Sequence, residues 1–394
     1  MSAPRTHTSS VASAMSLFEH FRDGTPRTRA ELMATTGLAR STIAARLDNL
    51  IDLDLIAPHE DGASTGGRPP SRFALNRAGR MLLCADLGAS HMTIALTDLT
   101  GAVLHEHTES LRIAEGPELT LARVTEVADD LLAEAGRGRD ALAAIGVGVP
   151  GPVEFSTGRP SNPPIMPGWD GYDIPGRLQE YAPIPVLVDN DVNIMALGER
   201  TTHFSEVDDL VFIKVGTGLG GSIISGGDLQ RGSRGIAGDL GHIRIARAAG
   251  MLCSCGNTGC LGAVASGRSL SKGMRARGFD IPDHNEIVRL VRQGDLEAIA
   301  VIRQAGRDIG EMLIACICVI NPSVIVLGGS IAQAGEYLLA GVREVVYSQS
   351  APLATHDLQI VQSRAGARAG IIGAAALAVE RLLTPEGAES MVPA

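Results

Sequence analysis

The 394-residue chain lacks an apolar run of the length, about 18 residues, that is needed to cross a bilayer. Its first thirty residues also lack the apolar segment of a signal peptide, because the short run VASAMSLF is followed directly by EHFRD. These absences predict a cytoplasmic protein with no membrane partner. Aromatic residues make up only 3% of the chain, so its core must be built from alanine, valine, leucine and isoleucine.

Cysteines are also scarce, and six of them in a chain of this length do not suggest a disulfide framework. Three of the six, Cys253, Cys255 and Cys260, nevertheless fall within eight residues, with His242 shortly before them. Three thiolates and one imidazole form a complete tetrahedral ligand set for Zn²⁺, and a closed set leaves no open position for catalysis. The spacing therefore predicts a structural zinc site.

The alternative is that these four residues are unrelated and that the cysteines act as small buried hydrophobic residues. We expect this second role for the other three cysteines, which lie in apolar runs: Cys84, Cys316 and Cys318.

The net charge of −10 is unevenly distributed along the chain. Residues 1–80 contain ten arginines against eight acidic residues, a net charge of +2, so the remainder carries −12. A mildly basic head on an acidic body is compatible with DNA binding by the head alone.

The head, residues 1–76, has the pattern of a helix-turn-helix. Residues 9–22 form one apolar helical stripe, and residues 28–56 predict two helices around a tight turn at Thr36–Gly37–Leu38. The second of these helices, 40–50, lacks a side-chain acceptor at its N-cap position, Ala39. Its polar face offers arginines and short polar side chains, which a major groove can admit. The predicted DNA-binding residues of this helix are Arg40, Ser41, Thr42 and Arg46.

A β-hairpin wing is predicted after this helix, because two short apolar runs flank a tip rich in glycine, serine and proline. Arg68 and Arg72 are placed there to meet phosphates or the minor groove. The alternative is a small helical dimerisation domain followed by a linker.

The sequence after the head, from Met81 onward, predicts two related halves of an α/β fold. From Met81 the expected order of elements is β-β-β-α-β-α-β-α, and from Leu210 a second strand, glycine turn and strand repeat the first. Two such halves suggest two lobes around a cleft. Their glycine turns would present backbone N–H groups that could hold phosphates.

The body carries six motifs: Asp86–Gly88, Gly148–Gly151, Asn190–Asp191, Gly216–Gly221, the segment 238–260 and Gly328–Gly329. On these motifs, residues 81–380 resemble the ROK family of sugar kinases and sugar-responsive repressors. The resemblance implies a two-lobed actin-like fold of the ribonuclease H type. The winged head and the motif Gly67–Arg68–Pro69 make the repressor branch the closer match. The expected domains are a winged helix-turn-helix over 1–76, a first lobe over 80–195 with a C-terminal helix 371–384, and a second lobe with the zinc knuckle over 196–370.

The resemblance also implies site residues. The family's kinases use the aspartate of an Asn-Asp pair as general base on a sugar hydroxyl, which corresponds here to Asp191, with Asn190 beside it. Asp191 could instead simply cap the helix that follows it. In the family pattern the zinc-bound histidine, His242, also faces the sugar, and Asp239 supplies a sugar carboxylate. If a nucleotide binds, its phosphates would lie against Asp86, Gly88, Gly216, Thr217, Gly218, Gly328 and Gly329.

Several positions depart from the family's pattern. The first phosphate turn, Asp-x-Gly-Gly-Thr-Lys in the family, ends here in Ala89-Ser90-His91. The family's sugar-binding glutamates are replaced by the shorter Asp239 and by Gly262. Trp169 lies in the loop beside the sugar and could stack on a ring or anchor the loop.

These departures favour a sugar-responsive DNA-binding regulator, most simply a repressor of carbohydrate-metabolism genes, over a sugar kinase that uses ATP and Mg²⁺. The expected partners are double-stranded operator DNA, a sugar or sugar phosphate, and further copies of the chain in a dimer or tetramer.

Overall fold

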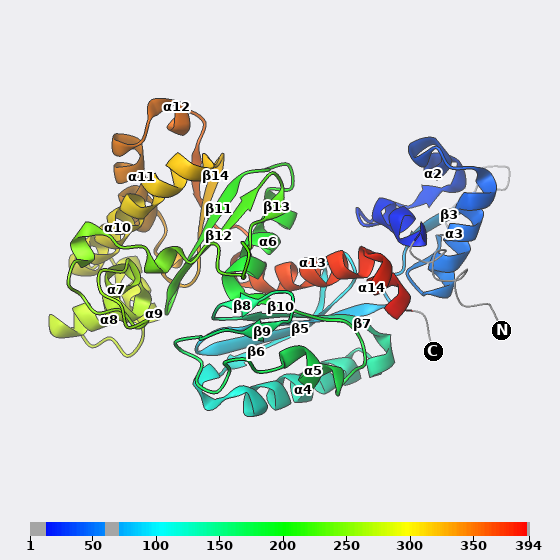
Figure 1. The fold of residues 1–394 in the computed structure, drawn as a ribbon, viewed down its shortest axis with the longest axis horizontal. Helices are drawn as coiled ribbons and strands as arrows, with labels where there is room; N and C mark the ends of the chain where they lie inside the picture. Colours follow the sequence, from blue (N-terminus) through cyan, green and yellow to red (C-terminus); the bar gives the residue numbers. More distant parts are fainter. Residues whose placement is uncertain (1–12, 60–70, 392–394) are drawn as a thin grey trace.

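The structure is a computed structural model that describes residues 13–59 and 71–391 (Figure 1). It has the predicted α/β architecture, with a small head followed by two lobes that each contain a five-stranded sheet. Among the described residues, no helix combines the length and the apolar character that a bilayer crossing requires.

The head has the order of elements of a winged helix-turn-helix. Residues 13–18 are helical and continue into η1 (Glu19–Phe21), which is followed by β1 (Arg27–Thr28), α2 (Arg29–Thr36), α3 (Arg40–Asp52), β2 (Ile56–His59) and β3 (Arg72–Leu75). The three strands form an antiparallel sheet in the order β1-β3-β2. The tip of the wing, including Arg68, lies outside the described residues.

Local sequence explains why the two helices begin and end where they do. A capping box starts α2, because the Thr28 hydroxyl accepts from the backbone N–H of Glu31 and the Glu31 carboxylate accepts from that of Thr28. Gly37 ends the helix with a left-handed φ of 71°. Ala39 precedes α3 and, as expected, provides no side-chain cap.

The first lobe is built on a sheet with strand order β10-β7-β4-β5-β6. Its strands are β4 (Met81–Leu87), β5 (His91–Thr97), β6 (Val103–Ser110), β7 (Leu142–Val149) and β10 (Val186–Asn190). The helices α4 (Pro117–Glu134) and α5 (Ile174–Gln179) cover one face of the sheet, and α13 (Ala369–Leu383) covers the other (Figure 1). The small hairpin of β8 (Val153–Glu154) and β9 (Arg159–Pro160) lies between β7 and α5 in the chain.

The second lobe repeats this topology with strand order β13-β12-β11-β14-β15. In both sheets three antiparallel strands are followed by two parallel ones, so the predicted duplication is confirmed. Its strands are β11 (Leu210–Val215), β12 (Leu219–Ser225), β13 (Asp228–Leu229), β14 (Val324–Gly328) and β15 (Gln359–Gln362). Its helices are α7 (Gly262–Ala265), α8 (Gly267–Ala276), α9 (His284–Arg292), α10 (Leu296–Ile320), α11 (Glu336–Gln349) and α12 (Pro352–Thr355).

Two helices link the parts of the molecule. Helix α6 (Asp191–His203) starts directly after β10, packs along α13 and contacts β11 and β12 of the second lobe. The expected boundary between residues 195 and 196 therefore falls inside α6. One continuous apolar core joins α13 and the first sheet to the head, and it includes Phe18, Leu50 and Phe73 of the head. The short helix α14 (Pro385–Ser390) packs on α13 at this junction.

Polar contacts reinforce the same junction. The Arg80 guanidinium donates to the carbonyl oxygens of Leu53, in the head, and Asp140, in the first lobe, at 3.3 and 2.8 Å. Arg137 of the first lobe donates in turn to the Gly79 carbonyl at 2.7 Å. The head is thus fixed to the first lobe by both apolar packing and hydrogen bonds.

The burial of side chains tests the expectations for the three remaining cysteines and for Trp169. Cys84 and Cys316 are buried as predicted, but the prediction for Cys318 is wrong, because its side chain is exposed. The helical period of α10 turns Cys316 inward and Cys318 outward near the end of the helix. Trp169 is fully buried and its indole N–H donates to the Ile113 carbonyl at 3.0 Å, so it anchors its loop.

Candidate functional site

A cluster of four possible metal ligands forms where the sequence places it. The ligand atoms of His242, Cys253, Cys255 and Cys260 all lie within 4.8 Å of one another. The sulfurs of Cys255 and Cys260 are 3.8 Å apart, and the Cys253 sulfur is 3.6 Å from Nδ1 of His242. Tetrahedral bonds of ordinary zinc–ligand length give separations of about 3.8 Å between two sulfurs and about 3.6 Å between sulfur and nitrogen. The cluster can therefore hold a metal ion.

The backbone around the cluster explains this geometry. His242 ends η4 (Leu240–His242), and Cys260 pairs with Arg244 in a β-bridge that brings the last cysteine back beside the histidine. Gly256 and Gly259 adopt φ values of 87° and 88°, which side chains disfavour and which fold the knuckle tightly. The four ligands come from an ordered loop of the second lobe.

The second nitrogen of His242 faces a carboxylate. Its Nε2 lies 3.9 Å from Oδ1 of Asp239, so the two predicted sugar-binding residues adjoin each other. Burial raises the pKa of Asp239, while the nearby imidazole lowers it. A metal on Nδ1 would leave Nε2 to carry the proton, and that N–H could donate to a ligand oxygen or to this carboxylate.

The pair Asn190–Asp191 lies at the start of α6, and the two residues play different parts there. Asn190, not Asp191, is the N-cap: its Oδ1 accepts from the Val192 backbone N–H at 2.9 Å. The Asn190 amide also donates to the Gly151 carbonyl at 3.0 Å. The Asp191 carboxylate instead accepts from the ammonium group of Lys214 at 2.5 Å.

Strand β12 lies between these two pairs. A Cβ on Gly220 would come within 2.9 Å of the Val192 side chain, and one on Gly221 within 2.5 Å of the Leu240 side chain. The Gly221 N–H also donates to the Gly238 carbonyl at 3.0 Å. Glycines at both positions let the start of α6 and the segment before His242 pack closely against the same strand. Both segments that carry the four predicted sugar-binding residues therefore contact β12.

The first glycine turn differs from an open phosphate cradle. Asp86 is buried at the end of β4, and its Oδ1 has no hydrogen-bond partner among the described residues. Burial raises the pKa of Asp86 to about 6, with Lys214 lowering and Asp191 raising it. A Cβ on Gly88 would lie only 2.4 Å from the His91 ring, so this imidazole fills the space over the turn.

In the glycine turns of the second lobe, several backbone groups are already engaged in hydrogen bonds within the protein. Gly216 donates to the Gly218 carbonyl at 2.9 Å, and the carbonyls of Gly216 and Thr217 accept from the first residues of α8. Beyond β14, Gly328 and Gly329 fit closely against Phe212 and Val215. Ser330 follows them, and its hydroxyl lies 2.7 Å from Nε2 of His284.

A salt bridge crosses from the second lobe to the first. The Arg231 Nε donates to Oδ2 of Asp189 at 2.7 Å, and the guanidinium lies 3.7 Å from the centroid of the Phe155 ring. The other carboxylate oxygen of Asp189 accepts from the Asn193 amide and the Asn190 N–H, both at 2.7 Å. Asp189 therefore ties the segment after β13 to the base of α6.

The predicted DNA-reading face of α3 is accessible. Arg40 and Ser41, in the first turn of α3, are exposed and Thr42 is half-buried, whereas Ile43 and Leu47 are buried. Three further residues complete the predicted set. Arg46 is half-buried and donates to the Ser16 hydroxyl at 3.0 Å, Arg72 lies on β3, and Arg68 is outside the described residues.

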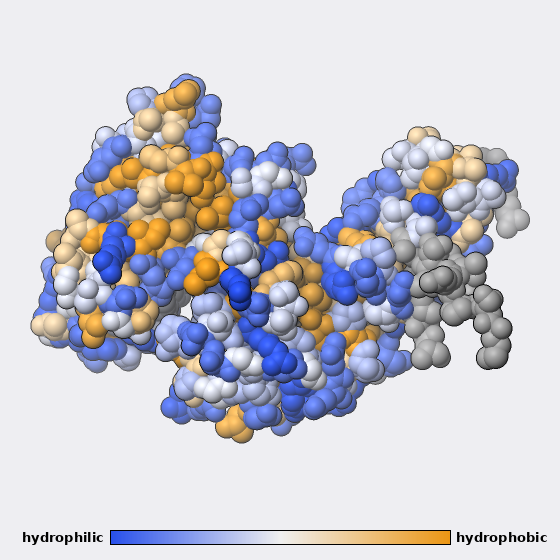
Figure 2. Space-filling view, viewed as in Figure 1, coloured by the Kyte–Doolittle hydropathy of each residue, from blue (hydrophilic) through white to orange (hydrophobic). Residues whose placement is uncertain are grey.

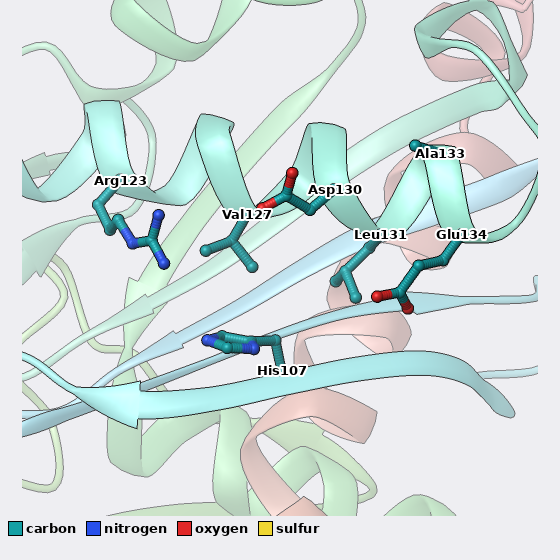
Figure 3. Close-up of a pocket in the computed structure, with 7 residues that line it drawn as sticks. All are labelled: His107, Arg123, Val127, Asp130, Leu131, Ala133 and Glu134. Atoms are coloured by element: carbon teal, nitrogen blue, oxygen red, sulfur yellow. The ribbon is translucent and has the colours of Figure 1, made fainter.

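A separate pocket opens on the outer side of the first lobe. It has a volume of about 320 Å³ and lies between α4 and β6, with His107 facing Arg123 and Glu134 across it (Figure 3). Arg123 pairs with Glu109 at 2.9 Å, and Glu109 also accepts from His107. None of the predicted site residues lines this pocket.

Comparison with known proteins decides the family. Residues 82–381 match the ROK family over three quarters of the chain. The chain belongs to the ROK family. The xylose repressor of Caldicellulosiruptor bescii is 28% identical over 370 residues, which cover 90% of this chain and 92% of the repressor.

Solved ROK structures also match. The crystal structure of a ROK family transcriptional regulator, a homologue of the E. coli MLC protein, gives a TM-score of 0.80 at 28% identity and covers 98% of both chains. A ROK family glucokinase from Streptomyces griseus, solved with glucose and AMPPNP, gives a TM-score of 0.65 at 27% identity. This match covers 99% of the glucokinase but only 76% of the present chain. The regulator therefore matches more of the chain than the kinase does.

The sequence pattern did not indicate three residues whose contacts are described above: Lys214, Arg231 and His284. The strand LVFIKV is otherwise apolar, so its lysine, one of two in the chain, was the available signal. Arg231 lies in the loop after β13, and His284 is the first residue of α9. A single residue of this kind in a loop or at a helix start has no distinguishing sequence pattern.

Proposed function

We propose that this chain is a sugar-responsive transcriptional regulator, acting in the cytoplasm as a repressor of carbohydrate-metabolism genes. In this proposal residues 1–76 bind operator DNA, while residues 80–195 with 371–384 and residues 196–370 close around a sugar or sugar phosphate. The observation that carries the proposal is the continuous apolar core between the winged head and the first lobe. A change in the body would be transmitted to the head through this core.

The proposed effector site consists of Asn190, Asp191, Asp239 and His242. Two carboxylates, an amide and an imidazole suit the alternating donors and acceptors of sugar hydroxyls. Each buried hydrogen bond of this kind contributes about 1–3 kcal/mol when its loss leaves a partner unsatisfied. The effector shifts DNA affinity only if it binds one lobe arrangement better, and a tenfold preference corresponds to about 1.4 kcal/mol.

We further propose that the cluster at His242 holds a structural Zn²⁺. Its four ligands form a closed shell, so the ion would orient the imidazole toward the sugar and would have no open position for water. Cys255→Ser should abolish stoichiometric zinc in native mass spectrometry and weaken the response to the effector. A variant that keeps one zinc ion per chain would contradict this ligand set.

The proposed regulator acts as a dimer or tetramer, because two heads on one palindrome must be held about 34 Å apart. Figure 2 shows apolar side chains gathered on the second lobe, over the region of α10, α11 and α12 in Figure 1. These elements expose Val319, Tyr347 and Leu353, of which Leu353 is 92% accessible. This surface is our candidate subunit contact.

The sugar kinase remains the second candidate function, because Asp191 is retained at the start of α6. Its observed partner, Lys214, weighs against a free general base. ATP consumption that depends on both a sugar and Asp191 would favour the kinase.

The proposal is tested with DNA and sugar together. An operator selected from random double-stranded DNA would be titrated by fluorescence anisotropy at fixed salt, with and without pentoses, hexoses, amino sugars and their phosphate esters. We expect one sugar class to change operator affinity at least about fivefold and to raise the melting temperature. No selected DNA at low salt would overturn the assignment of the head.

Two arginine variants distinguish the loss of a specific DNA contact from the general loss of a positive charge. Arg40→Ala should weaken operator binding by about 1–3 kcal/mol and leave the sugar-induced thermal shift unchanged. Arg112→Ala is the matched control, because Arg112 is an exposed arginine of the first lobe whose ion pair in the described structure is with Glu115 of its own turn. Equal losses in both variants would mean that α3 does not read DNA.

A further inference from the structure

Lys214 reaches from the second lobe to the carboxylate of Asp191, at the start of α6. Its ammonium group donates to Asp191 at 2.5 Å, and only 19% of the lysine side chain and 6% of the aspartate side chain are exposed. A second carboxylate, that of Asp86, is buried, and within the part of the chain that the structure describes one of its oxygens has no hydrogen-bond partner. Asp86 pairs in register with Gly148 of β7, and a Cβ on Gly148 would lie 3.4 Å from Cα of Asp191, so Asp86 and Asp191 are neighbours. Lys214 and Asp191 also act electrostatically on Asp86.

Lys214, Asp191 and Asp86 bear on whether a nucleotide with bound magnesium could fit at this position. Phosphoryl transfer needs a hard cation held by carboxylates and a backbone turn that is open to the phosphates. Here an ammonium group is already paired with Asp191, and the His91 ring fills the space over Gly88. His284 interacts electrostatically with His91, and its Nε2 forms a hydrogen bond with the Ser330 hydroxyl. The residues present do not fit a magnesium-bound triphosphate.

We propose that Lys214 is a built-in cation that, paired with Asp191 beside the buried Asp86, takes the place of a divalent metal ion at these carboxylates, so that the cleft receives its ligand without metal or nucleotide. The ammonium group supplies one positive charge permanently, and it does so from the lobe that faces the carboxylates. It neutralises Asp191 and links the two lobes in the same contact. Ligand binding in this cleft is therefore independent of magnesium.

The proposal makes a prediction about the metal alone. Replacing Lys214 by methionine keeps the length of the side chain and removes its charge, which leaves two neighbouring carboxylates uncompensated. Mn²⁺ is a suitable probe, because it prefers oxygen ligands and competes poorly for the thiolate cluster. Isothermal titration of the zinc-loaded full chain at pH 8 should show one Mn²⁺ site in Lys214→Met, bound at least about tenfold more tightly than in the wild type.

Two controls accompany this titration. Lys214→Arg retains the positive charge and should bind Mn²⁺ no better than the wild type. Lys272→Met removes the chain's other lysine, which is exposed on α8, and should also behave as the wild type. Equal Mn²⁺ affinity in the wild type and Lys214→Met would overturn the proposal, whether both bind tightly or neither binds.

A second measurement does not require Lys214→Met to fold. Reductive ¹³C-methylation labels only the two lysines and the chain's amino terminus. We expect the Lys214 methyl signal to be resolved from that of Lys272, and to move in Asp191→Asn while the Lys272 signal stays in place. A Lys214 signal that matches the exposed Lys272 and ignores Asp191→Asn would refute the contact. Neither measurement uses DNA or sugar, so this inference and the proposed function can fail separately.

Discussion

The salt bridge between Arg231 and Asp189 gives a prediction whose magnitude follows from its surroundings. Replacing Arg231 by methionine keeps an unbranched side chain and removes the guanidinium. Asp189 would keep both donors to Oδ1, the Asn193 amide and the Asn190 N–H, but Oδ2 would lose its 2.7 Å partner. The Asp189 side chain is only 3% exposed, so the orphaned oxygen would be poorly solvated.

Two contributions make up the expected loss of stability. A charge-assisted hydrogen bond to a buried group contributes about 1.5–3 kcal/mol. The stacking of the guanidinium on Phe155 adds about 0.5–2 kcal/mol. Because Arg231 is itself 20% exposed, water can replace part of the interaction, and we expect a total of about 2–4 kcal/mol. For a chain of this length that loss lowers the melting temperature by about 2–5 °C.

The assay is differential scanning calorimetry at pH 7 with the metal content held constant. Arg234→Met is the matched control, because Arg234 lies in the same loop, is 82% exposed and approaches Glu154 only to 3.9 Å. It should melt within about 1 °C of the wild type. If Arg231→Met also melts within that margin, or if its loss simply adds to that of Asp189→Asn, the bridge does not stabilise the fold as argued.

Two further predictions concern buried groups of the first lobe. Burial raises the pKa of Asp86 to about 6, above its value in the unfolded chain, so its ionisation costs stability as the pH rises from about 4 to above 6. Asp86→Asn should therefore gain about 1–3 kcal/mol relative to the wild type in urea unfolding at pH 7.5 but not at pH 4, and equal gains at both pH values would contradict this. Trp169→Phe removes the bond to the Ile113 carbonyl and part of a buried ring, so it should cost about 2–4 kcal/mol and leave the proposed effector's affinity unchanged. A large loss of effector affinity at full stability would instead make Trp169 part of the sugar site.

Much of the fold could be predicted because its patterns are local. The capping residues of α2, the glycine at its end and the apolar period of α3 specify the helix-turn-helix without long-range information. The duplicated strand and glycine turns likewise indicate two similar sheets. The metal cluster was predictable for the same reason, since three of its four ligands lie within eight residues.

What sequence reasoning did not supply depends on contacts between distant segments. Lys214 and Asp191 belong to different elements, and nothing in either strand or helix indicates that they form an ion pair. Asn190 was expected to bind sugar, and its use as the cap of α6 became visible only with the backbone geometry. The exposure of Cys318 depends on the direction in which one turn of α10 faces, which hydrophobicity alone does not specify.

The position of α13 has a consequence for how the chain is made. The first lobe begins at Met81, yet the helix that covers one face of its sheet, Ala369–Leu383, is among the last segments to be synthesised. At ordinary rates of translation, roughly 15–60 s separate the two, and during that time the head can fold while the sheet lacks its cover. Ribosomes that stop early would therefore release chains with a finished reading head and an apolar sheet face open to chaperones or aggregation.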